Sequence, residues 1–200
     1  MKNTILFFFA LVLFSCSKDD NNVTLQKLPD ETQTGENTFG FTVNENIYLP
    51  RDSNSQSSEI VKALSKLEGY LGNQDCLELT SLDLKSEKTS KIIVHIQDFR
   101  QNGVGAYTVD ISNGQANVYG YVHNYIHCKI FDSKTNAYKF YHSFMNSGKI
   151  NLTRLDAQNN IVSGNFSCKA VNSDNRKDTI EIKNGRFDIN LITILNEKFP

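Results

Sequence analysis

The strongest constraint on the fold is an alternation of apolar and polar residues with a period of two, which runs from Thr38 to the C-terminus. Successive side chains of a β-strand point to opposite faces, so this period predicts half-buried strands rather than helices. Near the start, Phe39, Phe41 and Val43 alternate with polar neighbours. The pattern recurs in later runs, at residues 77–79, 92–96, 107–109, 150–152, 162–170, 180–182 and 187–191.

Turn signals separate these runs, at residues 44–46, 113–114, 157–160 and 184–185. Two of them are Asn-Gly pairs, which favour tight hairpins because both residues adopt positive φ at low cost. About ten strands joined by short turns predict an all-β fold, either a meander-rich antiparallel β-sandwich or a flattened barrel. No stretch alternates strands with helices as βαβ units would.

One segment, residues 60–71, fits two structures. The spacing of Val61, Leu64, Leu67 and Leu71 fits one side of a helix, whereas Val61, Leu67, Gly69 and Leu71 fit one face of a strand. A Gly-Asn pair follows directly and suits a turn back into the next apolar run. We therefore favour the strand.

The N-terminal residues have the pattern of a targeting signal. Lys2 precedes an unbroken apolar run over residues 5–14, which is shorter than the roughly 20 residues needed to span a bilayer. Such a run is typical of an export signal and not of a membrane helix.

The end of that run, Leu13-Phe14-Ser15-Cys16, resembles the lipobox of bacterial lipoprotein signals. The resemblance implies cleavage after Ser15 and a diacylglycerol on the Cys16 thiol, and two or three acyl chains anchor a protein stably. The alternative is a secretory signal cut elsewhere. Residues 17–22 resemble the acidic export cluster of Bacteroidota-type lipoproteins, which implies the outer membrane and its outer surface. The alternative is a plain solvated tether.

These features divide the chain into a signal peptide over residues 1–15, a lipidated flexible tether over 16–36 and one antiparallel β domain over 37–200. The domain itself resembles small Bacteroidota-type lipoproteins of unknown activity. The resemblance rests on TGENTFGFTVNENIYLP at residues 34–50, and on SGKINLTRLD, IVSGNFSC and IEIKNGRFDI nearer the end. It implies an antiparallel β domain and supplies no catalytic residue.

The charge balance argues against nucleic acid as a partner. The chain has 21 Lys and Arg against 22 Asp and Glu, a net charge of -1, whereas nucleic-acid binders need a basic field. The chain contains no HExxH, GxSxG, P-loop, GxGxxG or CxxC motif. We therefore expect a protein that is not an enzyme and that uses no cofactor.

Two of the four histidines, His123 and His127, stand four residues apart. That spacing suits a metal on a helix, but in a strand it separates the residues by about 13 Å. The sequence therefore predicts no metal site.

The long run over residues 117–131 alternates as one strand with two different faces. Val122, Ile126 and Cys128 belong to the apolar face. The other face carries flat rings that could stack on a ligand, or that could simply stabilise the sheet by cross-strand pairing. The candidate ligand-binding residues on it are Tyr119, Tyr121, His123, Tyr125 and His127.

Three cysteines follow Cys16, namely Cys76, Cys128 and Cys168. Export permits disulfides, and Cys128 and Cys168 both lie on apolar strand faces, so they would pair if their strands were neighbours. Otherwise all three are inert buried thiols.

Together these features favour a lipid-anchored, non-enzymatic binding module of the outer membrane. It would meet the membrane through its anchor and bind an envelope protein or a glycan. The alternatives are an accessory subunit of an envelope complex and, less favoured, a hydrolase with dispersed carboxylates.

Overall fold

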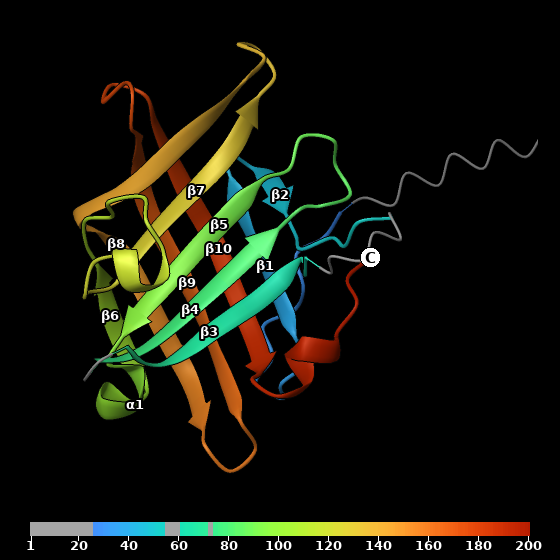
Figure 1. The fold of residues 1–200 in the computed structure, drawn as a ribbon, viewed down its shortest axis with the longest axis vertical. Helices are drawn as coiled ribbons and strands as arrows, with labels where there is room; N and C mark the ends of the chain where they lie inside the picture. The colour runs from blue at the N-terminus through green and yellow to red at the C-terminus, as the bar shows by residue number, and fades with distance from the viewer. Residues whose placement is uncertain (1–25, 55–60, 72–73) are drawn as a thin grey trace, which may run out of the picture.

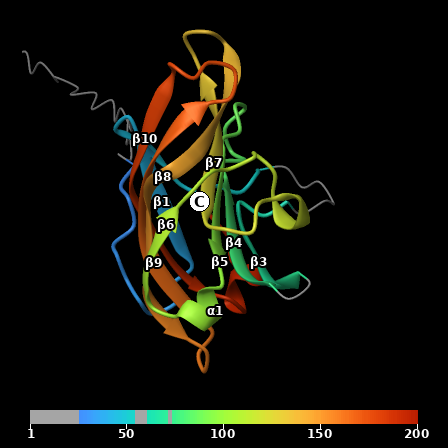
Figure 2. The same cartoon turned by 90° about the vertical axis from the view of Figure 1, so that its left-hand side faces the viewer.

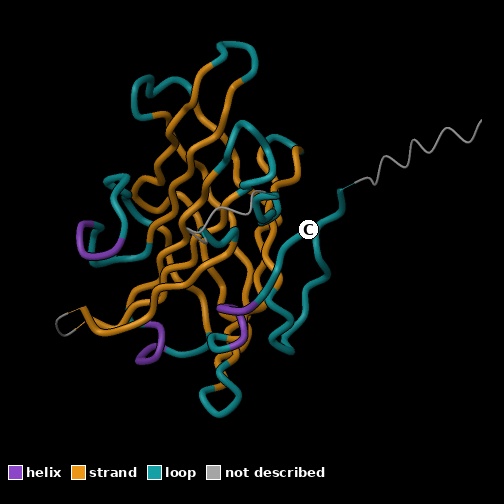
Figure 3. Tube along the Cα trace, turned by 45° about the vertical axis from the view of Figure 1, so that its right-hand side comes forward, coloured by secondary structure: helices purple, strands orange, loops and turns teal. Residues whose placement is uncertain are grey.

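The computed structural model describes residues 26–54, 61–71 and 74–200, so the predicted signal peptide and Cys16 lie outside the described residues. The described chain is built almost entirely from antiparallel strands, as the alternation predicted. Figure 3 shows that the helical turns are short and lie outside the sheet. None of the described helices is long and apolar enough to cross a membrane.

The elements are, in chain order, β1 (Thr38–Val43), β2 (Asn46–Tyr48), β3 (Leu64–Leu71), β4 (Gln74–Leu82), β5 (Lys91–Gln97), α1 (Phe99–Asn102), β6 (Gly105–Val109), η1 (Asn117–Tyr119), β7 (Tyr125–Asp132), β8 (Ala137–Asp156), β9 (Ile161–Asn172), β10 (Thr179–Asn190) and η2 (Thr193–Asn196). The ambiguous segment is a strand, β3, from Leu64 to Leu71, as we favoured.

The strands form one curled sheet in the order β2-β1-β10-β9-β8-β7-β5-β4-β3, and β6 also pairs with β8 (Figure 1). Seen edge-on in Figure 2, the half containing β1, β9 and β10 faces the half containing β3, β4 and β5. The 20-residue strand β8 joins the two halves. Its first residues pair with β7 and its later residues with β6, so β6 and β7 lie end to end along one edge.

The space between the halves is the hydrophobic core. It is filled by the inner-facing residues of both halves, for example Leu77 and Val94 from one half and Phe39 and Phe166 from the other. The rings of Phe39 and Phe166 are 5.6 Å apart. The alternation therefore predicted the inner face correctly in these strands.

Two turn predictions are wrong. Asn113-Gly114 does not connect a hairpin, because β6 pairs with β8 and not with β7. Asn184-Gly185 lies inside β10, where the pairing with β9 shifts register between Ile182 and Gly185. The positive φ of Asn184, 52°, is used there in a bulge, which bends one strand instead of reversing the chain.

Of the two alternatives for the cysteines, the structure has the buried free thiols and not the disulfide. Cys128 on β7 and Cys168 on β9 are free, as is Cys76, and all three are buried. The reason is the strand order, because β8 lies between β7 and β9. These two thiols behave as small apolar core residues, and burial raises the pKa of Cys168 to about 12.

The flexible tether predicted for residues 16–36 ends earlier than residue 36. The Asp188 carboxylate of β10, 1% exposed, accepts hydrogen bonds from the Thr32 hydroxyl (2.7 Å) and from the backbone N–H groups of Thr34 (2.9 Å) and Gly35 (2.9 Å). Ser163 Oγ donates a further bond of 2.6 Å. The sequence motifs TGEN and GRFD therefore meet in space at this buried carboxylate.

Candidate functional site

The five candidate ligand-binding residues do not share one strand face. Tyr119 and Tyr121 lie on a loop and are 75% and 44% exposed, whereas Tyr125 and His127 are buried on β7. The half-buried ring of His123 lies between the two groups, with Nε2 2.7 Å from the carbonyl oxygen of Ile111. The prediction of one strand over residues 117–131 is therefore wrong, because only its second half is strand.

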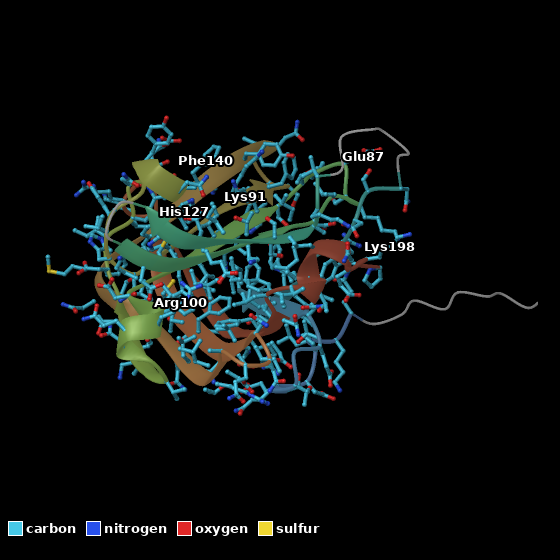
Figure 4. The ribbon with its side chains drawn as sticks, turned by 60° about the horizontal axis from the view of Figure 1, so that its bottom comes forward. Glu87, Lys91, Arg100, His127, Phe140 and Lys198 are labelled. Atoms are coloured by element: carbon cyan, nitrogen blue, oxygen red, sulfur yellow. The ribbon has the colours of Figure 1, made fainter. Side chains whose placement is uncertain are left out.

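The predicted apolar face of the run changes accordingly. Ile126 and Cys128 belong to the core, as expected, but Val122 on the loop is 60% exposed. Tyr125 and His127 point away from the core, on the outer face of the same sheet. Figure 4 shows His127 and Lys91 on this outer side.

Tyr125 and His127 belong to a buried polar group that we call the outer cluster, made of Glu78, His95, Tyr125 and His127. Strand register places Glu78 of β4, His95 of β5 and Tyr125 of β7 directly beside one another. The rings of His95 and Tyr125 stack with centroids 4.5 Å apart and planes 4° from parallel. Glu78 Oε2 accepts the Tyr125 hydroxyl at 3.0 Å and lies 3.2 Å from His95 Nδ1.

Residues 110–124, here called the cover loop, bury the outer cluster from the solvent side. The backbone N–H of Asn117 donates to Glu78 Oε2 (3.1 Å), and Ser112 Oγ lies 2.9 Å from His127 Nδ1. The loop passes so close that a Cβ on Gly120 would lie 2.2 Å from the Tyr125 hydroxyl oxygen. The outer cluster is therefore sealed and does not face a ligand.

Burial and hydrogen bonding set the charges in the outer cluster. Burial alone would raise the pKa of Glu78, but hydrogen bonds from His95, Asn117 and Tyr125 hold that pKa below its ordinary value. Burial and the neighbouring Glu78 charge raise the pKa of Tyr125. Burial, with a smaller effect from His142, lowers the pKa of His127 to about 4. At neutral pH the cluster therefore contains an ionised Glu78 and a neutral His127.

The Ser112–His127 contact has the length of a nucleophile and base pair. However, Ser112 Oγ also accepts the backbone N–H of Gly114 (3.0 Å), and both side chains are buried. Within the described ranges, no carboxylate bonds to the other nitrogen of His127. The contact fits the attachment of the cover loop better than covalent catalysis.

In the described part of the chain, no three His, Cys, Asp or Glu side chains are grouped so that they could hold a metal ion. His123 and His127 lie in different environments, one on the cover loop and one beneath it.

A separate cavity of about 450 Å³ opens at one end of the curled sheet, and we call it the end cavity. It is formed where the β1–β2 turn, the β7–β8 hairpin and the start of β10 come together. The side chains at its wall are Val43, Asn44, Asn46, Tyr48, Ile130, Phe131, Asp132, Ser133, Lys134, Lys139, Tyr141, Asp178, Thr179 and Ile180.

Polar groups converge on one wall of the end cavity. Lys139 Nζ lies 2.9 Å from both Asp132 Oδ2 and Asp178 Oδ2. The Tyr141 hydroxyl donates to Asp178 at 3.2 Å, and Asn172 Nδ2 donates to the same carboxylate at 3.0 Å. The hydrogen bond from Lys139 is the main reason that the pKa of Asp178 is lowered, and that of Asp132 falls to about 2. Burial and the Asp178 charge raise the pKa of Tyr141 to about 12.

Our sequence reasoning did not find the end cavity. Its polar residues lie beside turns at the ends of different strands, and charged residues beside turns are common in any hairpin. Only the assembled sheet brings Tyr48, Lys139 and Asp178 together.

Comparison with known proteins gives no family for this chain. No protein family model, no curated protein and no solved structure matches it.

Proposed function

We propose that this protein is a non-enzymatic binding module, anchored by lipid to the outer membrane, whose end cavity takes a small uncharged polar ligand. The observation that carries the proposal is the end cavity itself. Its volume of about 450 Å³ falls within the range of small-molecule sites, and aromatic rings line it together with a few converging polar groups.

The charges at the cavity wall favour an uncharged ligand. Two lysines, Lys134 and Lys139, balance two carboxylates, Asp132 and Asp178, so the wall has no formal excess of either sign. Carboxylate oxygens accept hydrogen bonds from hydroxyl groups, and the ring of Tyr48 offers a flat apolar surface. A monosaccharide or short neutral glycan has this combination of hydroxyl groups and apolar faces.

The binding experiment uses the full chain extracted in detergent and a panel of neutral mono- and disaccharides, detected by saturation-transfer NMR and calorimetry. We expect at least one sugar to bind, and Asp178→Asn or Tyr141→Phe to weaken it about tenfold, the loss of roughly one hydrogen bond to a charged group. Tyr121→Ser on the cover loop is the matched control and should leave binding unchanged. Absence of binding across the panel, or equal binding by all variants, contradicts the proposal.

The proposed lipid anchor rests on the lipobox resemblance and is tested separately. Cys16→Ser removes the one thiol at the predicted acylation position, so it should abolish palmitate labelling and move the chain from the membrane fraction to the soluble fraction. Cys76→Ser, which changes a buried thiol, should label like the parent. Equal labelling of Cys16→Ser and the parent contradicts the anchor.

A second candidate function is that of an accessory subunit, and the surface of the cover loop favours it. Ile111, Tyr119, Tyr121 and Val122 are exposed there. Exposed aromatic and aliphatic residues gathered on one loop are typical of protein-binding surfaces. Under this alternative, Tyr121→Ser abolishes capture of an envelope partner, whereas Asp178→Asn leaves it intact.

A further inference from the structure

The strand β3 forms one edge of the sheet. It pairs with β4 along its whole length, from Leu64 opposite Ser81 to Leu71 opposite Gln74. Among the described residues, none pairs with the outer edge of β3 by a strand ladder. The other end of the sheet, β2, has three residues, whereas β3 has eight and is long enough to take a further strand.

Two side-chain contacts link β3 and its flank to other elements. Arg100 of α1 binds Glu68, in the middle of the strand, with a nitrogen to oxygen distance of 2.5 Å. Just before the strand, Lys62 Nζ donates to the carbonyl oxygen of Glu197 (3.2 Å), close to η2. Figure 4 shows Arg100 and Lys198 at opposite sides of the molecule. Neither contact is a strand ladder, so the outer edge around Leu67 can pair with a partner strand.

The middle of β3 is self-complementary when it is reversed. In an antiparallel pair of two β3 strands centred on Leu67, each Lys66 lies opposite Glu68 of the second copy. Leu67 lies opposite itself, and Ser65 lies opposite Gly69. Opposite charges and apolar pairs directly across two strands stabilise a sheet, whereas like charges destabilise it. The twofold axis thus generates two complementary charge pairs from one strand.

The edge strand β3 contains a lysine, Lys66. A lysine in an edge strand normally opposes strand addition, because pairing would place its charge against another backbone without a partner. Here Lys66 and Glu68 already form an ion pair within one chain, and their side chains are 15% and 22% exposed. The second copy would bring the same two charges in reversed order, so each lysine keeps a carboxylate beside it.

Leu67 itself points to the outer face of the sheet, opposite to Lys66 and Glu68, and is 36% exposed. Its cross-strand neighbour on β4 is Glu78 of the outer cluster. A second Leu67 across the axis would cover this apolar side chain from the one side that the sheet leaves open.

We infer that two copies of this chain associate by antiparallel pairing of their β3 strands about a twofold axis at Leu67, which continues the curled sheet from one copy into the other. A twofold interface of this kind is closed, because each copy uses its own β3 edge and the same contact cannot be repeated with a third copy.

Crosslinking through a new cysteine tests both the pairing and its register. With the axis at Leu67, the two residues at position 67 have α-carbons about 4.5 to 5.5 Å apart, within the range of a disulfide. The two residues at position 65 are displaced by four residues, about 13 Å along the strands. Under mild oxidation of the full chain in detergent, Leu67→Cys should form a covalent dimer, and Ser65→Cys should not.

The parent chain sets the background of this experiment, because its described cysteines, Cys76, Cys128 and Cys168, are buried. Equal crosslinking of the two variants overturns the register. Crosslinking of neither overturns the interface.

Sedimentation gives an independent readout. The parent should sediment as a dimer at about 100 μM chain. Leu67→Asp sets two carboxylates against each other at the axis and should weaken the dimer at least tenfold relative to Leu67→Asn, which has nearly the same shape without charge. Tyr121→Ser should leave the dimer intact.

Three results overturn the inference: a monomeric parent, equal dimers of Leu67→Asp and Leu67→Asn, and loss of the dimer in Tyr121→Ser. The last result would assign the interface to the cover loop. Circular dichroism of each variant confirms that the sheet is retained.

Discussion

Glu78 and Asp188 are both buried carboxylates, but they accept hydrogen bonds from different parts of the chain. Asp188 accepts hydrogen bonds from the backbone of a segment more than 150 residues away, whereas Glu78 accepts two side chains of its own sheet and one backbone N–H of the cover loop. In both, hydrogen bonds overcome burial and lower the pKa. Asp188 therefore joins the N-terminal segment of the described chain to the last strand, whereas Glu78 attaches the cover loop to the sheet.

The largest effect should come from Asp188→Ala. The change leaves the donors of Thr32, Thr34, Gly35 and Ser163 without their acceptor, so it should lower the free energy of unfolding by about 3 kcal/mol or more. Urea denaturation measures this. Glu181→Ala on the surface of the same strand is the control and should change it by about 0.5 kcal/mol at most. A loss below about 1 kcal/mol for Asp188→Ala would show that the contact is not structural.

The outer cluster and the contact at Asp188 should lose their contributions to stability in different pH ranges. His127 has a pKa of about 4, below its unfolded value near 6.5, so the unfolded chain binds a proton first and stability falls as the pH drops between these values. The expected loss is about 2 kcal/mol between pH 6.5 and 4.5. Stability from Asp188 is lost only at lower pH, because its pKa is lowered from an already acidic value. His127→Gln should make the free energy of unfolding nearly independent of pH between 6.5 and 4.5, and should leave the loss at lower pH unchanged. An unchanged profile would contradict the assignment.

Glu78→Gln should have a smaller effect than Asp188→Ala, about 1 to 2 kcal/mol. Glutamine keeps one acceptor oxygen but cannot serve three donors at one carboxylate. The decisive readout is local: hydrogen exchange at the amide of Asn117 should quicken more than exchange in β9. Uniform quickening throughout the sheet would mean that Glu78 supports the whole fold, as Asp188 does.

The smallest effect should follow from Gly120→Ala. Gly120 has φ of -72°, which alanine adopts easily, so the cost comes from the contact of its new Cβ with the Tyr125 hydroxyl. We expect a loss of about 1 kcal/mol, measured by thermal unfolding. Gln115→Ala on the same loop is exposed and serves as the control. Equal stability of the two variants would indicate a cover loop that is looser than its contacts suggest.

The strands of the sheet could be predicted from the sequence because the alternation of apolar and polar residues shows which face of a strand is buried. This prediction failed at residues 117–124, where rings alternate with small residues as they would in a strand, but the backbone turns through η1. Alternation does not report whether a backbone has a hydrogen-bonding partner. Asn117 has a φ of 55° there, a left-handed backbone conformation that asparagine tolerates better than most residues.

The second failure concerns residues 26–36, whose polar composition is typical of a linker. They are attached by Asp188, Arg154 and Arg186, which lie far along the chain and which a single sequence does not connect with them. The end cavity was missed for the same reason, since Asp132 and Asp178 become neighbours of Lys139 only through the pairing of β7, β8 and β9.

The place of β10 in the sheet has a consequence for how the chain acquires its structure. β10 lies between β9 and β1, so the first strands along the chain wait for the last strand before they can join the sheet. Long-range pairing of this kind slows folding, because loop-closure entropy must be overcome before native contacts form. A nascent chain from which residues 179–190 have not yet emerged would leave β1 without its β10 partner, with Phe39 and Phe41 exposed to chaperones and proteases.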